Sequence, residues 1–298
     1  MLSVRFTILV LIMGLAGVVS VFAASGGIRE AAEQADEIPA LFLKLFTVAP
    51  ERIPAFFTLI GLLGPLLGII FAFDAINGER TQGTLPRLLA QPIYRDDVIN
   101  GKFVAALTVI GLILVSLVMI VAGVGLFRIG IIPTAREVTR VIVWLVVSLF
   151  YVGFWLSLAT LFSVWLRRAS TSALAAIAAW LVSTLFAGLL VGIIADAVAP
   201  APEGASVEEQ LRNAKWNQNL ARVFPGALYE EATVVLLQPE IRSLGILFPE
   251  QVDRAVPTEL SLDQSLLIVW PQLAGLIALT VLCFAGAYVL FMRQEIRA

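Results

Sequence analysis

The side chains that most often do chemistry in proteins are scarce in this sequence. It contains no histidine and a single cysteine, Cys283. Histidine is the commonest general base and metal ligand, and thiolate metal sites and disulfides within a chain need more than one cysteine. The remaining chemistry is that of carboxylates, basic groups and hydroxyls. We therefore expect no enzyme, no metal site and no bound cofactor.

The sequence also lacks the residues of a nucleotide-binding phosphate loop and the ionisable residues that functional sites within a membrane require. Gly101-Lys102 is not preceded by the glycine that a G-x-x-x-x-G-K phosphate loop requires, because that position is Asp96. The apolar stretches carry almost no ionisable residue, Asp74 lying at the end of one, which argues against an ion-coupled transporter and an intramembrane protease. If the protein uses ATP, a partner chain must bind and hydrolyse it.

The polar connection 77–102 carries the most informative pattern. Leu85, Leu88 and Leu89 share one face at helical spacing, while Arg80 and Arg87 lie at other angles. Pro92 disfavours a helical conformation at Gln91. The pattern therefore predicts a short amphipathic helix over 79–90. Two interpretations stand side by side: a solvated loop, or a helix whose leucine face docks into a groove on a partner protein.

The elements around this connection are strongly apolar. Of 298 residues, 59% are hydrophobic and 14% charged, and the mean hydropathy is +0.94. Soluble domains have about 45–50% apolar and about 25% charged residues, so the composition argues against a water-soluble enzyme. A helix of roughly 17–25 apolar residues crosses a bilayer. The sequence predicts six spans in one domain, 1–298: Phe6–Ala24, Pro54–Ile76, Phe103–Phe127, Val138–Leu166, Thr171–Ala195 and Leu266–Met292.

The basic residues predict how these spans are oriented. One side holds nine Lys and Arg in about 42 non-membrane residues, and the other holds eleven in about 112. The denser side is expected in the cytoplasm, so both termini are expected on the cytoplasmic side of the plasma (inner) membrane. The net charge of −2 then divides into +4 inside and −6 outside, and it gives no sign of nucleic-acid binding. The outer loop that contains Arg128, Arg136 and Arg140 runs against this rule locally.

The long segments Ser25–Ile53 and Asp196–Ser265 then lie outside. Ser206 and Glu209 fit a capping box that begins a helix ending near Val223, and a second helix is expected over Ala227–Leu237. A further outer helix is expected over Ile28–Phe46. These helices predict an extracytoplasmic cap, either as structural cover for the spans or as a lid over a ligand.

The first span has a second interpretation. Arg5, the apolar run and the small residues around Ala24 resemble a cleavable signal peptide, although one basic residue is a weak signal. We expect an uncleaved span.

Small residues at four-residue spacing predict close helix contacts in two spans. Such contacts serve either packing within the chain or association of two copies. The candidate residues are Gly64 and Gly68 in the second span, and Ala175, Ala179, Gly188 and Gly192 in the fifth.

The connection contains Glu79-x-x-x-Gly83-Thr84-Leu85, followed by Leu88-Leu89-Ala90-x-Pro92-Ile93-x-Arg95 and Gly101-Lys102. These motifs resemble the permease subunits of the ABC-2 transporter family, in particular a six-span branch with gliding-motility and nitrous-oxide-reductase maturation permeases. The resemblance is most specific over this connection. Phe224-Pro225-x-x-Leu228-Tyr229 and the carboxyl-terminal span also resemble this branch.

The resemblance implies a membrane subunit that pairs with a second copy or a sibling permease and docks on cytoplasmic ATPase subunits. The connection would carry the coupling helix of the family, which maps to Glu79–Ala90. The leucine face would fill a groove on the ATPase, and Glu79, Arg80, Arg87 and Arg95 would contact it. The function expected is a permease, an exporter powered by a separate ATPase. The alternatives are a membrane scaffold or assembly factor whose outer cap holds a partner, and a passive channel, for which the spans offer few polar groups.

Overall fold

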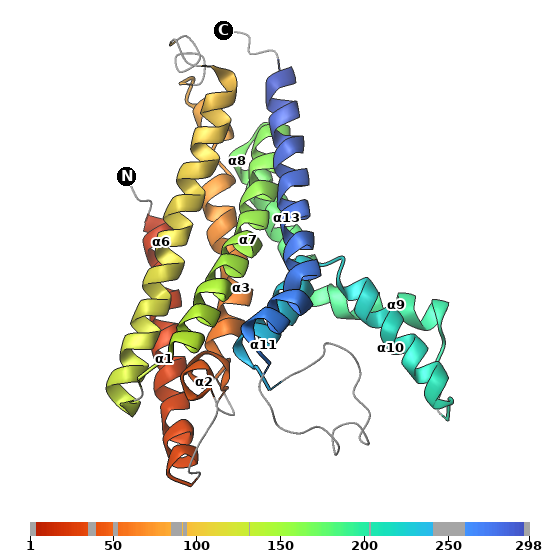
Figure 1. The fold of residues 1–298 in the computed structure, drawn as a ribbon. Helices are drawn as coiled ribbons and strands as arrows, with labels where there is room; N and C mark the ends of the chain where they lie inside the picture. The colour runs from red at the N-terminus through yellow and green to blue at the C-terminus, as the bar shows by residue number, and fades with distance from the viewer. Residues whose placement is uncertain are drawn as a thin grey trace.

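The computed structural model describes residues 4–34, 40–49, 53–84, 91, 94–130, 132–202, 204–240 and 260–294, and these residues form helices without any strand (Figure 1). The helices are α1 (Val4–Gln34), α2 (Leu41–Thr47), α3 (Phe56–Ala72), α4 (Asn77–Thr81), α6 (Arg95–Ile129), α7 (Ala135–Trp165), α8 (Ala169–Leu181), the π-helical η1 (Val182–Phe186), α9 (Ala187–Val198), α10 (Val207–Ala221), α11 (Pro225–Leu237) and α13 (Leu262–Arg293).

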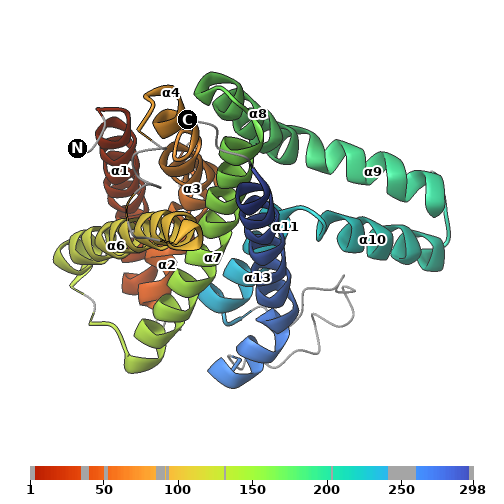
Figure 2. The same ribbon diagram turned by 90° about the horizontal axis from the view of Figure 1, so that it is seen from above.

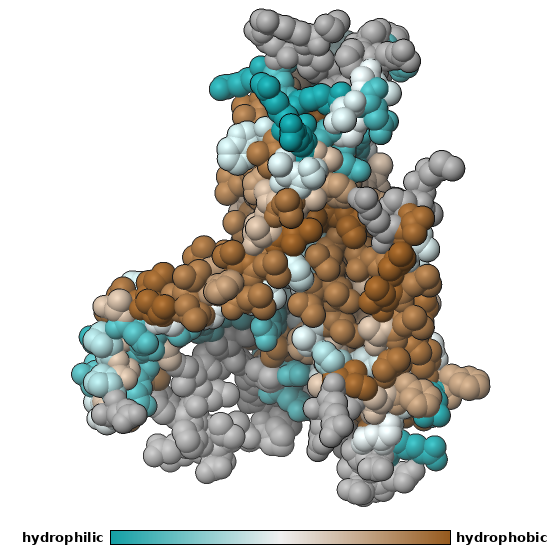
Figure 3. Space-filling model, turned by 180° about the vertical axis from the view of Figure 1, so that it is seen from behind, coloured by the Kyte–Doolittle hydropathy of each residue, from teal (hydrophilic) through white to brown (hydrophobic). Residues whose placement is uncertain are grey.

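Six helical segments of the described chain are long and apolar enough to cross a membrane. They are Thr7–Arg29, Phe56–Thr81, Arg95–Ile129, Ala135–Trp165, Ala169–Val198 and Leu262–Arg293. On the face drawn in Figure 3, apolar residues form a broad belt, with polar residues gathered at the end that holds α4. The predicted all-α membrane fold with six spans is confirmed.

The fourth span, α7, is the centre of the bundle. It packs against α3, α6, α11 and α13, and Figure 2 shows these helices around it. Trp144, Val147 and Ala159 on α7 have no exposed surface. Because this helix is covered by protein on most sides, its large side chains fill the core, whereas α1 and α6 expose apolar faces suited to lipid.

The first span is part of this bundle. The hydroxyl of Ser20 donates to the carbonyl of Pro54 at 2.9 Å, and a Cβ at Gly17 would lie 2.9 Å from the Phe56 ring. The helix also continues unbroken through Ala24 and Ser25. These contacts make α1 part of the described bundle.

Three boundaries differ from the sequence predictions. The helix expected over Ile28–Phe46 is instead the end of α1 and the separate α2, preceded by Ala40 at φ 52°. The third span begins at Arg95 rather than Phe103, because Asp96 and Asp97 suit the positive end of a helix. The helix expected over 79–90 does not run continuously, since α4 ends at Thr81 and Gly83 adopts φ 66°.

The fifth span is divided where η1 joins α8 to α9. In both ribbon views α9 and α10 lie side by side and project away from the bundle (Figures 1 and 2), and we call this pair the arm. Asn213 on α10 holds the pair together by donating to the Asp196 carboxylate and the Ala199 carbonyl, both at 2.8 Å. The predicted capping box of Ser206 and Glu209 begins α10, and α11 packs closely onto α7 and α13.

Two of the three arginines that run against the charge rule, Arg128 and Arg140, make contacts between helices near the arm end of the bundle. Arg140 is buried on α7, where its guanidinium donates to the carbonyls of Leu236 and Leu260 and to the hydroxyl of Ser265. Arg128 lies over the ring of Phe22, 4.0 Å from its centroid. These side chains join helices, so their position reflects packing rather than topology.

Candidate functional site

The connection 77–102 lies at the end of the bundle opposite the arm, which we call the basic end (Figure 1). Its first residues form α4 and the turn that follows, and its last residues form the first turns of α6. Leu85, Arg87, Leu88 and Leu89 lie outside the described residues. The site that can be built is therefore the root of the connection, where it leaves α3 and enters α6.

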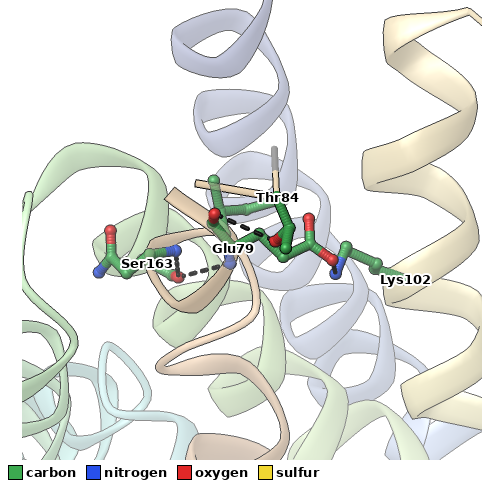
Figure 4. A network of polar contacts seen from close by, with 6 residues as sticks. Glu79, Thr84, Lys102 and Ser163 are labelled. Atoms are coloured by element: carbon green, nitrogen blue, oxygen red, sulfur yellow. Dashed lines mark hydrogen bonds and ion pairs between the residues drawn. The ribbon is translucent and has the colours of Figure 1, made fainter. Parts of the chain in front are cut away.

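The first contact of this root is with α7. The backbone N–H groups of Ile76 and Asn77 both donate to the hydroxyl oxygen of Ser163, at 3.1 and 3.3 Å. Figure 4 shows Ser163 reaching the start of α4 from the end of α7. Ser163 and Asn77 are fully buried, so water cannot replace this bond. The hydroxyl thus satisfies two donors at the turn between α3 and α4.

The second contact joins the two ends of the connection. Lys102 on α6 forms an ion pair with Glu79 on α4, with 2.6 Å between the ammonium and the carboxylate. The carbonyl of Glu79 accepts from the backbone N–H of Thr84 at 2.9 Å and from its hydroxyl at 3.2 Å (Figure 4). Gly83 permits this turn, because its φ of 66° is unfavourable for other residues. Glu79 therefore fixes where the chain leaves α4.

The third contact is with the last span. Gln294, at the end of α13, donates from its side chain to the Val164 carbonyl at 2.7 Å and accepts from Arg80. Its backbone carbonyl accepts from Arg95 at 3.2 Å. One residue thus binds an arginine on each side of the connection.

The predicted residues Glu79, Arg80, Gly83, Thr84 and Arg95 are therefore grouped at the root. Three of them bind residues outside this group: Glu79 binds Lys102, and Arg80 and Arg95 bind Gln294. Sequence reasoning missed Ser163, Gln294 and the pairing of Lys102. No pattern in the sequence marks them, because their partners lie tens to hundreds of residues away.

Residues 1–296 match the family described as ABC-2 family transporter protein. The chain belongs to the ABC-2 family. It is similar to the protein named probable ABC transporter permease protein NosY of Stutzerimonas stutzeri, with 37% identity over 92 residues, which are 31% of this chain and 32% of the relative. The protein of the same name from Pseudomonas aeruginosa is 35% identical over 97 residues, 33% of each chain. The chain thus spans about a third of the length of these curated relatives.

The candidate packing residues of this ABC-2 chain fall into two groups. A Cβ at Gly68 would lie 2.7 Å from the Val152 carbonyl of α7, and one at Gly64 would lie 3.0 Å from the Val152 side chain. Gly188 and Gly192 have nothing within 4 Å of such a Cβ. The small residues of the second span thus face α7, while those two glycines of the fifth span face open space within the described chain. Ala175 and Ala179, on α8, are half-buried.

Proposed function

We propose that this chain is the membrane-spanning permease subunit of an ABC-2 exporter, driven by separate cytoplasmic ATPase subunits that dock on the connection 77–102. Membership of the ABC-2 family supports the permease role, and the names of the NosY relatives agree with it. In this proposal the protein lies in the plasma membrane with both termini and the basic end in the cytoplasm. It binds no nucleotide itself, and it pairs with a second copy or a sibling permease.

The observation that carries this proposal is the anchoring of the connection at its root. Hydrogen bonds and an ion pair tie it to the ends of α6, α7 and α13, and α4 follows directly from α3. A displacement of the connection by an ATPase would therefore move four spans together. An unattached loop would bend without moving them. In this proposal the polar residues of the root position the connection, and the leucine face meets the partner.

The test is co-purification of the permease with a candidate ABC ATPase subunit expressed together with it. The double variant Leu85→Asp/Leu89→Asp is expected to lose the ATPase, because two carboxylates would have to be buried in an apolar groove. Tyr94→Asp is the matched control, since Tyr94 lies in the same connection, is 79% exposed and is not part of the leucine face.

Both variants should elute from size exclusion as the wild type does. Equal association of the folded double variant and the control would overturn the docking role. A docked permease that leaves ATP turnover unchanged on reconstitution would instead indicate a scaffold.

A further inference from the structure

A cavity of about 400 Å³ lies at the root of the arm, remote from the connection 77–102. Residues of α3, η1, α9, α10 and α11 form its walls, together with Tyr151 of α7. Its volume is in the range of cavities that bind small molecules in proteins. Leu62 and Thr184 on its rim are exposed, so the cavity is open at its side.

The cavity exists because its walls are built from small residues. Gly61, Ala187, Gly188, Ala221, Gly226 and Ala227 all line it. A Cβ added at Gly188 would meet no atom within 4 Å. Phe57, Leu62 and Val191 supply larger apolar surface. The body of a ligand in this space would therefore be in contact with hydrocarbon.

One wall is held rigid by two stacked tyrosines. The rings of Tyr151 and Tyr229 are 4.4 Å apart and nearly parallel. The Tyr151 hydroxyl donates to the Gly61 carbonyl at 2.8 Å, and the Tyr229 hydroxyl lies 3.4 Å from that of Ser148. Burial raises the pKa of Tyr229, so this wall stays uncharged. The cavity is thus present in the folded chain and does not depend on a ligand to form.

Polar groups lie on the remaining sides. Asn217 comes from the arm, and Ser183 and Thr184 come from η1. π-helical turns within α-helices are frequent at functional sites. Among the described residues that line the cavity, Glu230 on α11 is the one with a charged side chain, and none of them is basic. Its carboxylate is exposed and has no hydrogen bond or ion pair with the rest of the described chain. The charge at this site therefore favours a cation and disfavours an anion.

The position of the cavity indicates where such a ligand comes from. In Figure 3 the apolar side of the arm is continuous with the apolar belt, and its polar side faces away from the belt. Leu189 and Ile193 on α9 are 58% and 62% exposed. A helix pair with one apolar and one polar side is suited to the membrane interface. The arm is then interfacial, and α8 with η1 is the part of the fifth candidate span, Ala169–Val198, that enters the hydrocarbon layer. The cavity between the arm and the bundle is then open to the leaflet at the arm end.

We propose that this cavity binds an amphiphile from that leaflet, with a hydrocarbon chain against the small-residue walls and a cationic ammonium head beside Glu230. The site is independent of the proposed docking of an ATPase, and it needs no nucleotide.

The test uses the full chain in dodecyl maltoside and tritiated dodecyltrimethylammonium as the probe, with binding followed by scintillation proximity. Wild type is expected to bind the probe saturably, and unlabelled dodecyl sulfate, which has the same chain length and an anionic head, is expected not to displace it. Glu230→Gln should weaken binding about threefold to fivefold, because an exposed charge pair contributes little more. Glu240→Gln, which removes an exposed carboxylate that does not line the cavity, should bind as wild type.

Gly188→Leu provides the steric test, because its side chain would fill the cavity. Gly192→Leu is the matched control: it lies one turn along the same helix and also has open space, but it does not line the cavity. Gly188→Leu should abolish binding and Gly192→Leu should retain it, with equal thermal unfolding midpoints.

Three binding results would overturn the proposal. They are the absence of saturable binding, equal displacement by the anionic amphiphile, and wild-type binding by Gly188→Leu. A change of oligomeric state caused by Gly188→Leu would also overturn it, since a second copy of the chain would then occupy the cavity.

Discussion

Glycines with the same spacing have different surroundings in the second and fifth spans. Gly64 and Gly68 allow the backbones of α3 and α7 to approach closely, and the atoms nearest Gly68 are backbone atoms of Val152 and Leu156. Gly188 and Gly192 have open space around them. The spacing alone predicts that a close approach is allowed, but it cannot say which helix uses it. That depends on the partner that the fold places opposite each glycine.

This difference makes the effect of one methyl group predictable. Gly68→Ala should lower the free energy of unfolding by about 1–3 kcal/mol, because the new Cβ would overlap backbone that cannot rotate away. Gly192→Ala is the control, and it should be neutral or stabilise by up to about 1 kcal/mol, since alanine is the better helix former and has room. Unfolding in a titration of sodium dodecyl sulfate from dodecyl maltoside micelles measures both. Equal midpoints for the two variants would show that α3 and α7 do not pack as described.

At the scale of the elements, the sequence predicts the features that are determined by residues close together in the chain, namely the spans and the ends of several helices. Six spans follow from hydropathy, and the start of α10 follows from Ser206 and Glu209. The end of α11 follows from Pro239 after Gln238. The contacts that build the candidate site could not be predicted in this way. Arg80 and Gln294 are 214 residues apart, and neither hydropathy nor spacing relates such positions. The division of the fifth span at η1 was missed too, because its composition is as apolar as that of a continuous span.

The hydroxyl of Ser163 joins α7 to the turn between α3 and α4, and this joint can be tested by removing it. Ser163→Ala leaves the N–H groups of Ile76 and Asn77 without their acceptor in a dry environment, which should cost about 1–3 kcal/mol. Ser157→Ala on the same helix is the matched control: Ser157 is equally buried, but its hydroxyl donates to Phe154 of its own helix, so no backbone donor is left unpaired. Thermal unfolding in detergent should separate the two variants. A larger loss for Ser157→Ala would contradict the assigned joint.

At the scale of the whole molecule, the apolar belt separates two unlike ends. The basic end gathers α4, the start of α6 and the end of α13, while the arm and α11 lie toward the other end (Figure 1). Residues that determine packing, such as Arg140, add basic charge to the arm end without marking it as cytoplasmic. When such buried arginines are left out of the count, the difference in basic charge between the basic end and the arm end becomes larger. The predicted orientation thus depends on which arginines are buried, which the sequence does not reveal.

The single cysteine makes this orientation directly measurable. In a Cys283→Ala background, Tyr94→Cys places a thiol at the basic end and Val207→Cys places one on the arm, at positions that are 79% and 60% exposed. A sulfonated maleimide carries a charge and cannot cross the hydrocarbon layer. In right-side-out membrane vesicles it should label Val207→Cys and spare Tyr94→Cys until detergent is added, and inside-out vesicles should give the reverse. The cysteine-free chain sets the background. Labelling of Tyr94→Cys from outside would place the connection 77–102 beyond the reach of a cytoplasmic ATPase and would remove the proposed coupling with it.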